Sequence, residues 1–174
     1  IGNVTKLDAV FAGAKAFNQS IVAWDVSKVT TTEKMFQNAT AFNQSLLGWK
    51  TGAIINMESM FDGATSFNQK LDTWDVRNVV NANYMFQGAV SFNQSLNAWN
   101  TGTFKYVSGM FRGATGYNRP MNLWDVSKIT DFSYMFSSAS NFDQDISDWC
   151  VEHVPSIPVG FKDACPLNAV NSPK

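Results

Sequence analysis

A repeat of 25 residues runs through the whole chain and limits what it can fold into more than any other feature. The recurring aromatic residues are Phe11, Phe36, Phe61, Phe86, Phe111, Phe136 and Phe161, together with Trp24, Trp49, Trp74, Trp99, Trp124 and Trp149. A fixed period of this length is typical of repeat architectures, in which each unit packs only on its neighbours. We therefore expect one domain over residues 1–174, with stacked repeats over about 4–149 and a C-terminal capping unit over 150–174.

The first half of each unit predicts a short helix of about two turns. Thr30 and Glu33 have the spacing of a capping box, and Met35 and Phe36 follow with a one-sided helical spacing. The residues two positions after each recurring phenylalanine would end the helix, because most of them are Gly or Asn, which tolerate the left-handed conformation. They are Gly13, Asn38, Gly63, Gly88, Gly113, Ser138 and Asp163.

The next segment, Phe42-Asn43-Gln44-Ser45-Leu46 in the second unit, predicts a short parallel strand. Stacked strands would place equivalent residues about 4.8 Å apart, so that amide side chains could hydrogen-bond along the stack. The expected structural ladder consists of Asn18, Asn43, Asn68, Asn93 and Asn118. The repeat thus predicts an α/β solenoid of short parallel strands and short helices.

Alternate units end differently, which adds a period of 50 to the period of 25. Trp24, Trp74 and Trp124 are followed by Asp-Val, whereas Trp49 and Trp99 begin Trp-Lys-Thr-Gly and Trp-Asn-Thr-Gly. We expect differing corner turns on alternate coils.

Composition excludes two classes of partner. The 174 residues include 13 basic and 14 acidic ones, and the basic ones form no stripe of the kind that nucleic acid needs. No apolar run approaches the roughly 20 residues that span a bilayer. The chain starts inside a repeat at Ile1, so we expect it to be part of a longer protein.

The two cysteines, Cys150 and Cys165, both lie in the last unit. One pair is too few for a typical zinc site, so a disulfide is the favoured interpretation, and it would indicate an oxidising, extracellular setting. The alternative is two unpaired small apolar residues in a terminal unit.

No residue pattern points to a reaction. The one histidine, His153, lies beside the prolines of the last unit, and solvated carboxylates are a simpler interpretation of Asp143, Asp145 and Asp148 than a calcium site. We therefore expect no enzyme activity, no cofactor and no metal.

Function would lie in repeat positions that vary. Two such positions flank the predicted strand and would form an exposed strand-side binding face. Its candidate residues are Ser45, Leu47, Lys70, Asp72, Ser95, Asn97 and Asn122. The alternatives to a binding module are a passive spacer within a larger surface protein and a polysaccharide hydrolase.

The repeated string Met-Phe-x-Gly/Asn-Ala-Thr-x-Phe-Asn-Gln-x-Leu-x-x-Trp-Asp-Val resembles the 25-residue repeat of the BspA-like surface proteins, which include the mycoplasma surface-lipoprotein repeat. The resemblance extends from Val4 to Leu167, with departures at Tyr117 and Asp143. It implies a right-handed leucine-rich-repeat-like solenoid on secreted or cell-surface proteins and no known catalytic residues. It also implies adhesion, or binding of a protein or glycan ligand on a cell surface or matrix.

Overall fold

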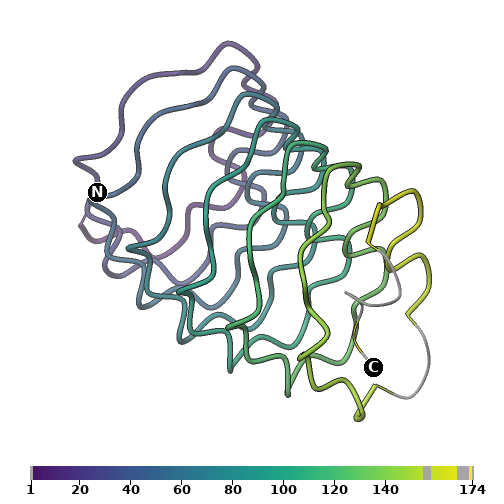
Figure 1. Ribbon diagram of the computed structural model, residues 1–174. Helices are drawn as coiled ribbons and strands as arrows, with labels where there is room; N and C mark the ends of the chain where they lie inside the picture. Colours follow the sequence, from purple (N-terminus) through teal and green to yellow (C-terminus); the bar gives the residue numbers. More distant parts are fainter. Residues whose placement is uncertain (1, 155–157, 168–172, 174) are drawn as a thin grey trace.

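The chain winds into coils of similar shape that stack one on the next, as the computed structural model shows (Figure 1). The structure describes all residues except 1, 155–157, 168–172 and 174. Each tryptophan ends one coil, the next coil begins at the corner that follows it, and the coils are numbered in chain order. Coils 1 to 6 comprise residues 2–24, 25–49, 50–74, 75–99, 100–124 and 125–149, and coil 7 starts at residue 150.

None of the described residues lies in a helix or a strand. Neighbouring coils share only isolated parallel bridges, which join Lys6, Thr31, Asn56, Asn81, Tyr106 and Asp131 in sequence. The expectation of an α/β leucine-rich-repeat-like solenoid with short helices and short strands was therefore wrong, because the coils consist of turns and loops. Within the described residues there is also no helix of the length and apolarity needed to cross a membrane.

The predicted helix is absent because alternate N–H groups bond to the next coil instead of to the preceding turn. In coil 2 the donors to coil 3 carbonyls are the N–H groups of Thr32, Lys34, Phe36 and Asn38, with N···O distances of 2.7–3.0 Å. The Met35 and Gln37 N–H groups between them return to carbonyls three residues earlier. An α-helix would need every one of these N–H groups for its own i−4 carbonyl.

Two left-handed residues per coil produce this alternation. Lys34 has a φ of 56° and Asn38 a φ of 57°, and each bends the chain so that the next free N–H again points along the stack. The left-handed conformation expected at Gly13, Gly63, Gly88, Gly113 and the equivalent Asn38 and Ser138 is confirmed, although it shapes an arc of turns and ends no helix.

The predicted capping box is also absent. Thr30 Oγ1 donates to the Thr5 carbonyl of coil 1 at 3.2 Å. The N–H of Glu33 is accepted by Asp8 Oδ1 of coil 1 at 3.0 Å. The spacing of Thr30 and Glu33 therefore serves contacts between coils, in place of the start of a helix.

Side-chain amides stack the segment that was expected to be a strand. Asn18 Oδ1 accepts the backbone N–H of Asn43 at 2.9 Å and the Gln44 side-chain N–H at 3.0 Å. Equivalent bonds from backbone N–H groups reach Asn43, Asn68, Asn93 and Asn118. A side-chain carbonyl here replaces the backbone carbonyl that a neighbouring strand would offer.

Columns of aromatic rings fill the interior. Within coil 2, Phe36 and Phe42 stack with ring centroids 4.0 Å apart, and the same pair recurs in coils 1 to 6. The tryptophans point inward as expected, with Trp49 3% exposed. Its Nε1–H donates to the Ile21 carbonyl of coil 1 at 3.2 Å, and the tryptophans of coils 3 to 6 repeat this bond. Each indole thus packs in the core with its polar atom satisfied.

The coils are not evenly spaced around their circumference. Ring centroids of successive coils are 5.5–5.7 Å apart in the Phe36 column and 5.8–6.0 Å apart in the Phe42 column. The distance rises to 6.2–6.4 Å between tryptophans. The rings are thus more widely spaced than the strand-like separation of about 4.8 Å that was expected, and the stack opens toward its tryptophan side.

The period of 50 comes from an alternation of large and small residues between coils. A Cβ placed on Gly52 of coil 3 would lie 2.9 Å from Asp75 Oδ2 of coil 4, and Gly102 has the same relation to Asp125. Thr51 Oγ1 also donates to the Asp75 carbonyl at 3.0 Å. Coils with an Asp corner therefore fit on coils with a Gly corner.

The last unit departs from the register of its sequence by one residue. Gly160 and Ala164 have the positive φ values of Tyr134 and Ser138, 26 residues earlier, so Ala164 takes the place expected for Asp163. Phe161 consequently meets Phe136 edge-on, at an interplanar angle of 82°. Phe161 therefore follows the period of 25 in the sequence but does not occupy the equivalent position in the stack.

One buried side-chain polar atom has no hydrogen-bond partner in the described part of the chain. Tyr117 occupies the Phe42 column, and its hydroxyl is buried without a hydrogen bond. Burial raises the pKa of this phenol far above its ordinary value of 10.0.

We expect Tyr117→Phe to raise the free energy of unfolding by about 1–2 kcal/mol, because it removes a desolvated hydroxyl and keeps the ring. Urea unfolding with an unchanged m-value would measure it. A loss of stability in this variant would show that the hydroxyl forms a bond in solution.

Candidate functional site

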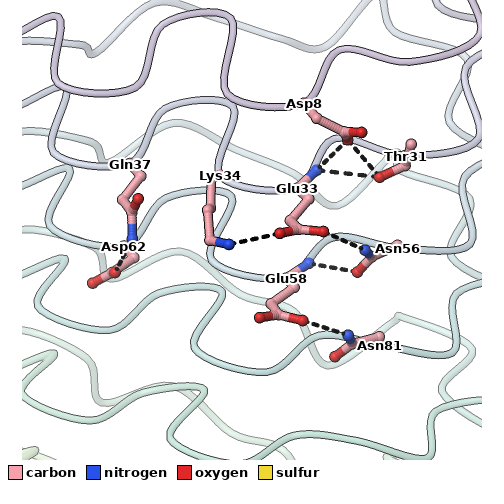
Figure 2. A network of polar contacts seen from close by, with 9 residues as sticks. All are labelled: Asp8, Thr31, Glu33, Lys34, Gln37, Asn56, Glu58, Asp62 and Asn81. Atoms are coloured by element: carbon pink, nitrogen blue, oxygen red, sulfur yellow. Dashed lines mark hydrogen bonds and ion pairs between the residues drawn. The ribbon is translucent and has the colours of Figure 1, made fainter.

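Four repeat positions lie along the bridged part of the coils, and most of their side chains point outward, whereas Ser59, Ser108 and Ser137 at these positions are buried. We call this surface the ladder face and define it in coil 2 by Thr31, Glu33, Lys34 and Gln37, and in the other coils by the equivalent residues (Figure 2). These positions vary from coil to coil, whereas the aromatic positions behind them stay almost constant.

Many polar side chains of the ladder face have a structural task. The N–H groups that do not bond to the next coil need an acceptor, and side-chain oxygens provide it. Asn56 Oδ1 accepts the Glu58 N–H at 3.0 Å, and Asn81 Oδ1 accepts the Asn83 N–H at 3.0 Å. These asparagines are explained by the fold and are not evidence of a ligand.

The carboxylates of coils 2 and 3 are held mainly by amides. Glu33 pairs with Lys34 at 2.7 Å and accepts from Asn56 at 3.3 Å, and Glu58 accepts from Asn81 at 2.8 Å (Figure 2). Asp62 accepts from Gln37 of coil 2 at 2.9 Å and from Gln87 of coil 4 at 3.1 Å. This half of the ladder face is therefore acidic and ordered.

The other half of the ladder face is aromatic. Tyr84, Tyr106 and Tyr134 lie at its positions in coils 4, 5 and 6, so three of the 4 tyrosines in the chain share one surface. Tyr106 is 45% exposed. Arg112, exposed at the position of Gln37, lies over the Tyr134 ring at 5.2 Å.

Two of these tyrosines occupy a backbone conformation that favours glycine. Tyr84 and Tyr134 have φ values of 56° and 57°, and glycines hold the equivalent position in the coils that follow them. A Cβ on Gly109 would lie 2.5 Å from the Tyr84 ring, and Gly160 is placed similarly against Tyr134. A bulky residue in this region is uncommon and costs energy, which singles these positions out.

The predicted binding face lies elsewhere on the coils, on either side of the buried residues Leu46, Leu71 and Leu96. Of its candidates, Leu47, Lys70, Asp72, Ser95 and Asn122 are exposed, and Ser45 and Asn97 are half-buried. Their hydrogen bonds are mostly local: Ser45 Oγ accepts the Leu47 N–H and Ser95 Oγ accepts the Asn97 N–H, each at 3.4 Å. Asn97 also donates to Asn122 at 3.1 Å. Binding through these residues stays a prediction.

The prediction of a disulfide was wrong, since both cysteines are free. Cys150 is exposed at the corner position that holds Asp25, Asp75 and Asp125 in other coils. The Cys165 thiol donates to the Phe142 carbonyl at 3.2 Å, and burial raises its pKa. The cysteine-based argument for an oxidising, extracellular setting therefore falls, and the fold by itself gives no evidence of adhesion or of a surface location.

His153 and Asp145 each contact a nearby polar group. His153 Nε2 is 2.7 Å from the Ile129 carbonyl. Asp145 Oδ1 accepts from the N–H and the hydroxyl of Ser147 at 3.0 and 2.7 Å. Across the described residues, no three His, Cys, Asp or Glu side chains are placed to hold a metal ion.

The corner aspartates show the electrostatic effect of their turns. Hydrogen bonds from Ser27 lower the pKa of Asp25, and those from Ser127 lower the pKa of Asp125. The Arg77 guanidinium likewise lowers the pKa of Asp75. All three carboxylates accept the N–H two residues on, so their role is to shape corners.

Sequence reasoning missed the aromatic half of the ladder face. The signal was present: Tyr84, Tyr106 and Tyr134 interrupt positions that are small or polar in most other units. It was hidden because these positions were assigned to a short helix, and the binding face was expected on the other side of each unit.

Stacked aromatic columns, inter-coil hydrogen bonds and a variable outer face define a tandem-repeat protein. The chain belongs to the family described as "Mycoplasma protein of unknown function, DUF285", whose model matches residues 1–94 and again 69–172. No curated protein and no solved structure matches the chain.

Proposed function

We propose that this chain is a non-enzymatic interaction module that contacts a macromolecular partner through the ladder face of coils 4 to 6. The observation that carries the proposal is the gathering of Tyr84, Tyr106, Arg112 and Tyr134 on this surface. Tyrosine and arginine are the residue types most enriched, with tryptophan, among those that dominate binding energy at protein interfaces.

The fold supports this proposal by making the surface rigid. Coils 2 to 6 are bonded through their backbones to both neighbours along the ladder positions, so the backbone there loses little freedom when a partner binds. Stacked repeats commonly offer such extended surfaces to other molecules. The core positions, by contrast, are accounted for by packing alone.

Placement on a cell surface or outside the cell is part of the proposal. It rests on the resemblance of the repeat to the BspA-like surface proteins, since the cysteines no longer support it. The partner would then be a protein or glycan of a surface or matrix.

Binding to a panel of immobilised extracellular-matrix proteins and glycans would test the proposal. We expect a binder whose signal falls at least roughly tenfold with Tyr106→Ala, as is usual for a residue that dominates an interface. Asp72→Ala, on the face predicted from the sequence, is the matched control, and thermal melting should be unchanged in both. A loss of binding with Asp72→Ala, and not with Tyr106→Ala, would show that the partner binds the face predicted from the sequence.

A passive spacer is the main competitor, because a regular stack also sets a distance. A spacer needs no exposed tyrosines, so a chain with Tyr84, Tyr106 and Tyr134 all replaced by smaller residues would keep its function in the parent protein. A module that binds through the ladder face would lose it.

A further inference from the structure

The aromatic half of the ladder face carries a cation whose hydrogen-bonding capacity is unused. The Arg112 side chain forms no hydrogen bond and no ion pair with any described residue, and it lies over the Tyr134 ring. The other arginines are engaged: Arg77 forms a two-point ion pair with Asp75 at 2.8 and 3.0 Å, and Arg119 donates to the Asn93 carbonyl at 2.8 Å. The fold therefore leaves the Arg112 guanidinium available.

The guanidinium is nevertheless held in place. It lies 5.2 Å from the centroid of Tyr134, a ring that also packs against Gly160 of coil 7. Stacking on an aromatic ring restrains an arginine and leaves the edge of its planar fork open to a ligand. A planar fork of this kind pairs with a carboxylate through two parallel hydrogen bonds.

The tyrosines limit what else can bind here. Tyr84 packs against Gly109, and Tyr134 lies between Gly160 and Arg112, so neither presents two open faces. A sugar stacked on Tyr134 is therefore disfavoured, whereas the tyrosine hydroxyls and the more exposed Tyr106 remain suited to a polypeptide.

The acidic half of the ladder face restricts the footprint. Glu58 and Asp62 of coil 3 adjoin the coil that carries Tyr84, and amides rather than cations hold both carboxylates in place. Like charges placed side by side oppose binding. An acidic ligand is therefore favoured near Arg112 and disfavoured over coil 3.

Asp131 of coil 6 also places a carboxylate on this face. It is bridged to Tyr106 and accepts the Ser133 N–H at 2.8 Å. The ligand carboxylate would therefore lie on the Arg112 side.

We propose that the ladder face of coils 4 to 6 binds a carboxylate-bearing segment of a partner protein, with Arg112 pairing with the carboxylate and Tyr106, at the other end of the face, packing against another part of the same segment. This inference rests on the proposed function and names the partner class for the same surface.

A phage-displayed library of random peptides, about 12 residues long and selected on the intact chain, tests the inference. We expect the selected peptides to contain Asp or Glu, and we expect Arg112→Ala to weaken their binding roughly 10- to 100-fold, as for hydrogen bonds between charged groups. Arg112→Lys should recover only part of the affinity, because it keeps the charge and loses the fork.

A double-mutant cycle makes the test specific. Changing the Glu of a selected peptide to Gln should lower the peptide's affinity for the unmodified chain. The same peptide change should have little further effect on its affinity for the Arg112→Ala variant. Peptides that bind without an acidic residue, and that depend on Tyr106 but not on Arg112, would overturn this inference and leave the proposed function intact. Binding that depends on neither residue would overturn both.

Discussion

Deletion of one coil is expected to harm this protein more than deletion of two. A variant without residues 50–74 should unfold at a lower temperature than a variant without residues 50–99, although it keeps one coil more. Simple additivity along a repeat array predicts the reverse order, since stability then falls with each unit removed. Thermal unfolding followed by circular dichroism distinguishes the two outcomes.

The reason lies in the alternation of large and small residues. In the intact chain the Asp75 carboxylate faces Gly52, and a Cβ added there would lie only 2.9 Å from it. Without coil 3, Asp75 would face Ser27, which has a larger side chain. Lys34 would likewise meet Tyr84 in a column where the intact chain places Ser59 between them. Each forced contact costs about 1–3 kcal/mol. Removal of coils 3 and 4 together places Gly102 on coil 2 and keeps the alternation.

Ser27→Gly provides the matched control for this comparison. In the chain without residues 50–74 it should recover part of the lost stability, because it restores room for the Asp75 carboxylate. In the intact chain it should have a small effect, since the backbone N–H of residue 27 still bonds to Asp25. An equal effect in both backgrounds would refute the packing explanation.

The stacking of the chain was predictable because it depends on side chains that recur. Phe36, Phe42 and Trp49 had to be interior in any fold that repeats them, and each of them is buried. The stacking of the Asn and Gln side chains was predictable for the same reason. Their hydrogen bonds differ from the expectation, because backbone N–H groups and glutamine side chains donate to asparagine oxygens, whereas like amides were expected to pair.

The local structure was not predictable because its decisive feature is the direction of backbone N–H groups. Thr30, Glu33, Met35 and Phe36 match a helix start in spacing, and the positive φ of Lys34, which no residue pattern indicates, is one of the two that send alternate N–H groups along the stack. Lysine gives no sequence signal for that conformation, unlike the glycine at the equivalent position 109. The same error assigned the tyrosine positions to a helix and so concealed the ladder face.

The disulfide could not be judged from spacing. Cys150 and Cys165 are close in sequence, but Cys150 is exposed at a corner, whereas the Cys165 thiol donates to the Phe142 carbonyl. Sequence spacing does not record how two side chains are directed. Pairing inferred from count alone is weak for this reason.

Replacement of a central ring should have the largest effect of any single substitution. Phe86→Ala in coil 4 is expected to lower the free energy of unfolding by about 3–5 kcal/mol. Phe86 is fully buried, and its ring stacks on Phe61 and Phe111 at 5.6 Å each and on Phe92 at 4.2 Å. Such a loss is a large share of the roughly 5–15 kcal/mol that stabilises a typical domain.

The same substitution at the end of the stack isolates the contribution of the column. Phe11 occupies the equivalent position in coil 1, is only half-buried, and has a ring neighbour in its column on one side, Phe36 at 5.6 Å. Phe11→Ala should therefore cost clearly less than Phe86→Ala in urea unfolding. Equal losses would mean that each ring is stabilised within its own coil, by the partner it stacks on there, and that the columns joining the coils contribute little to stability.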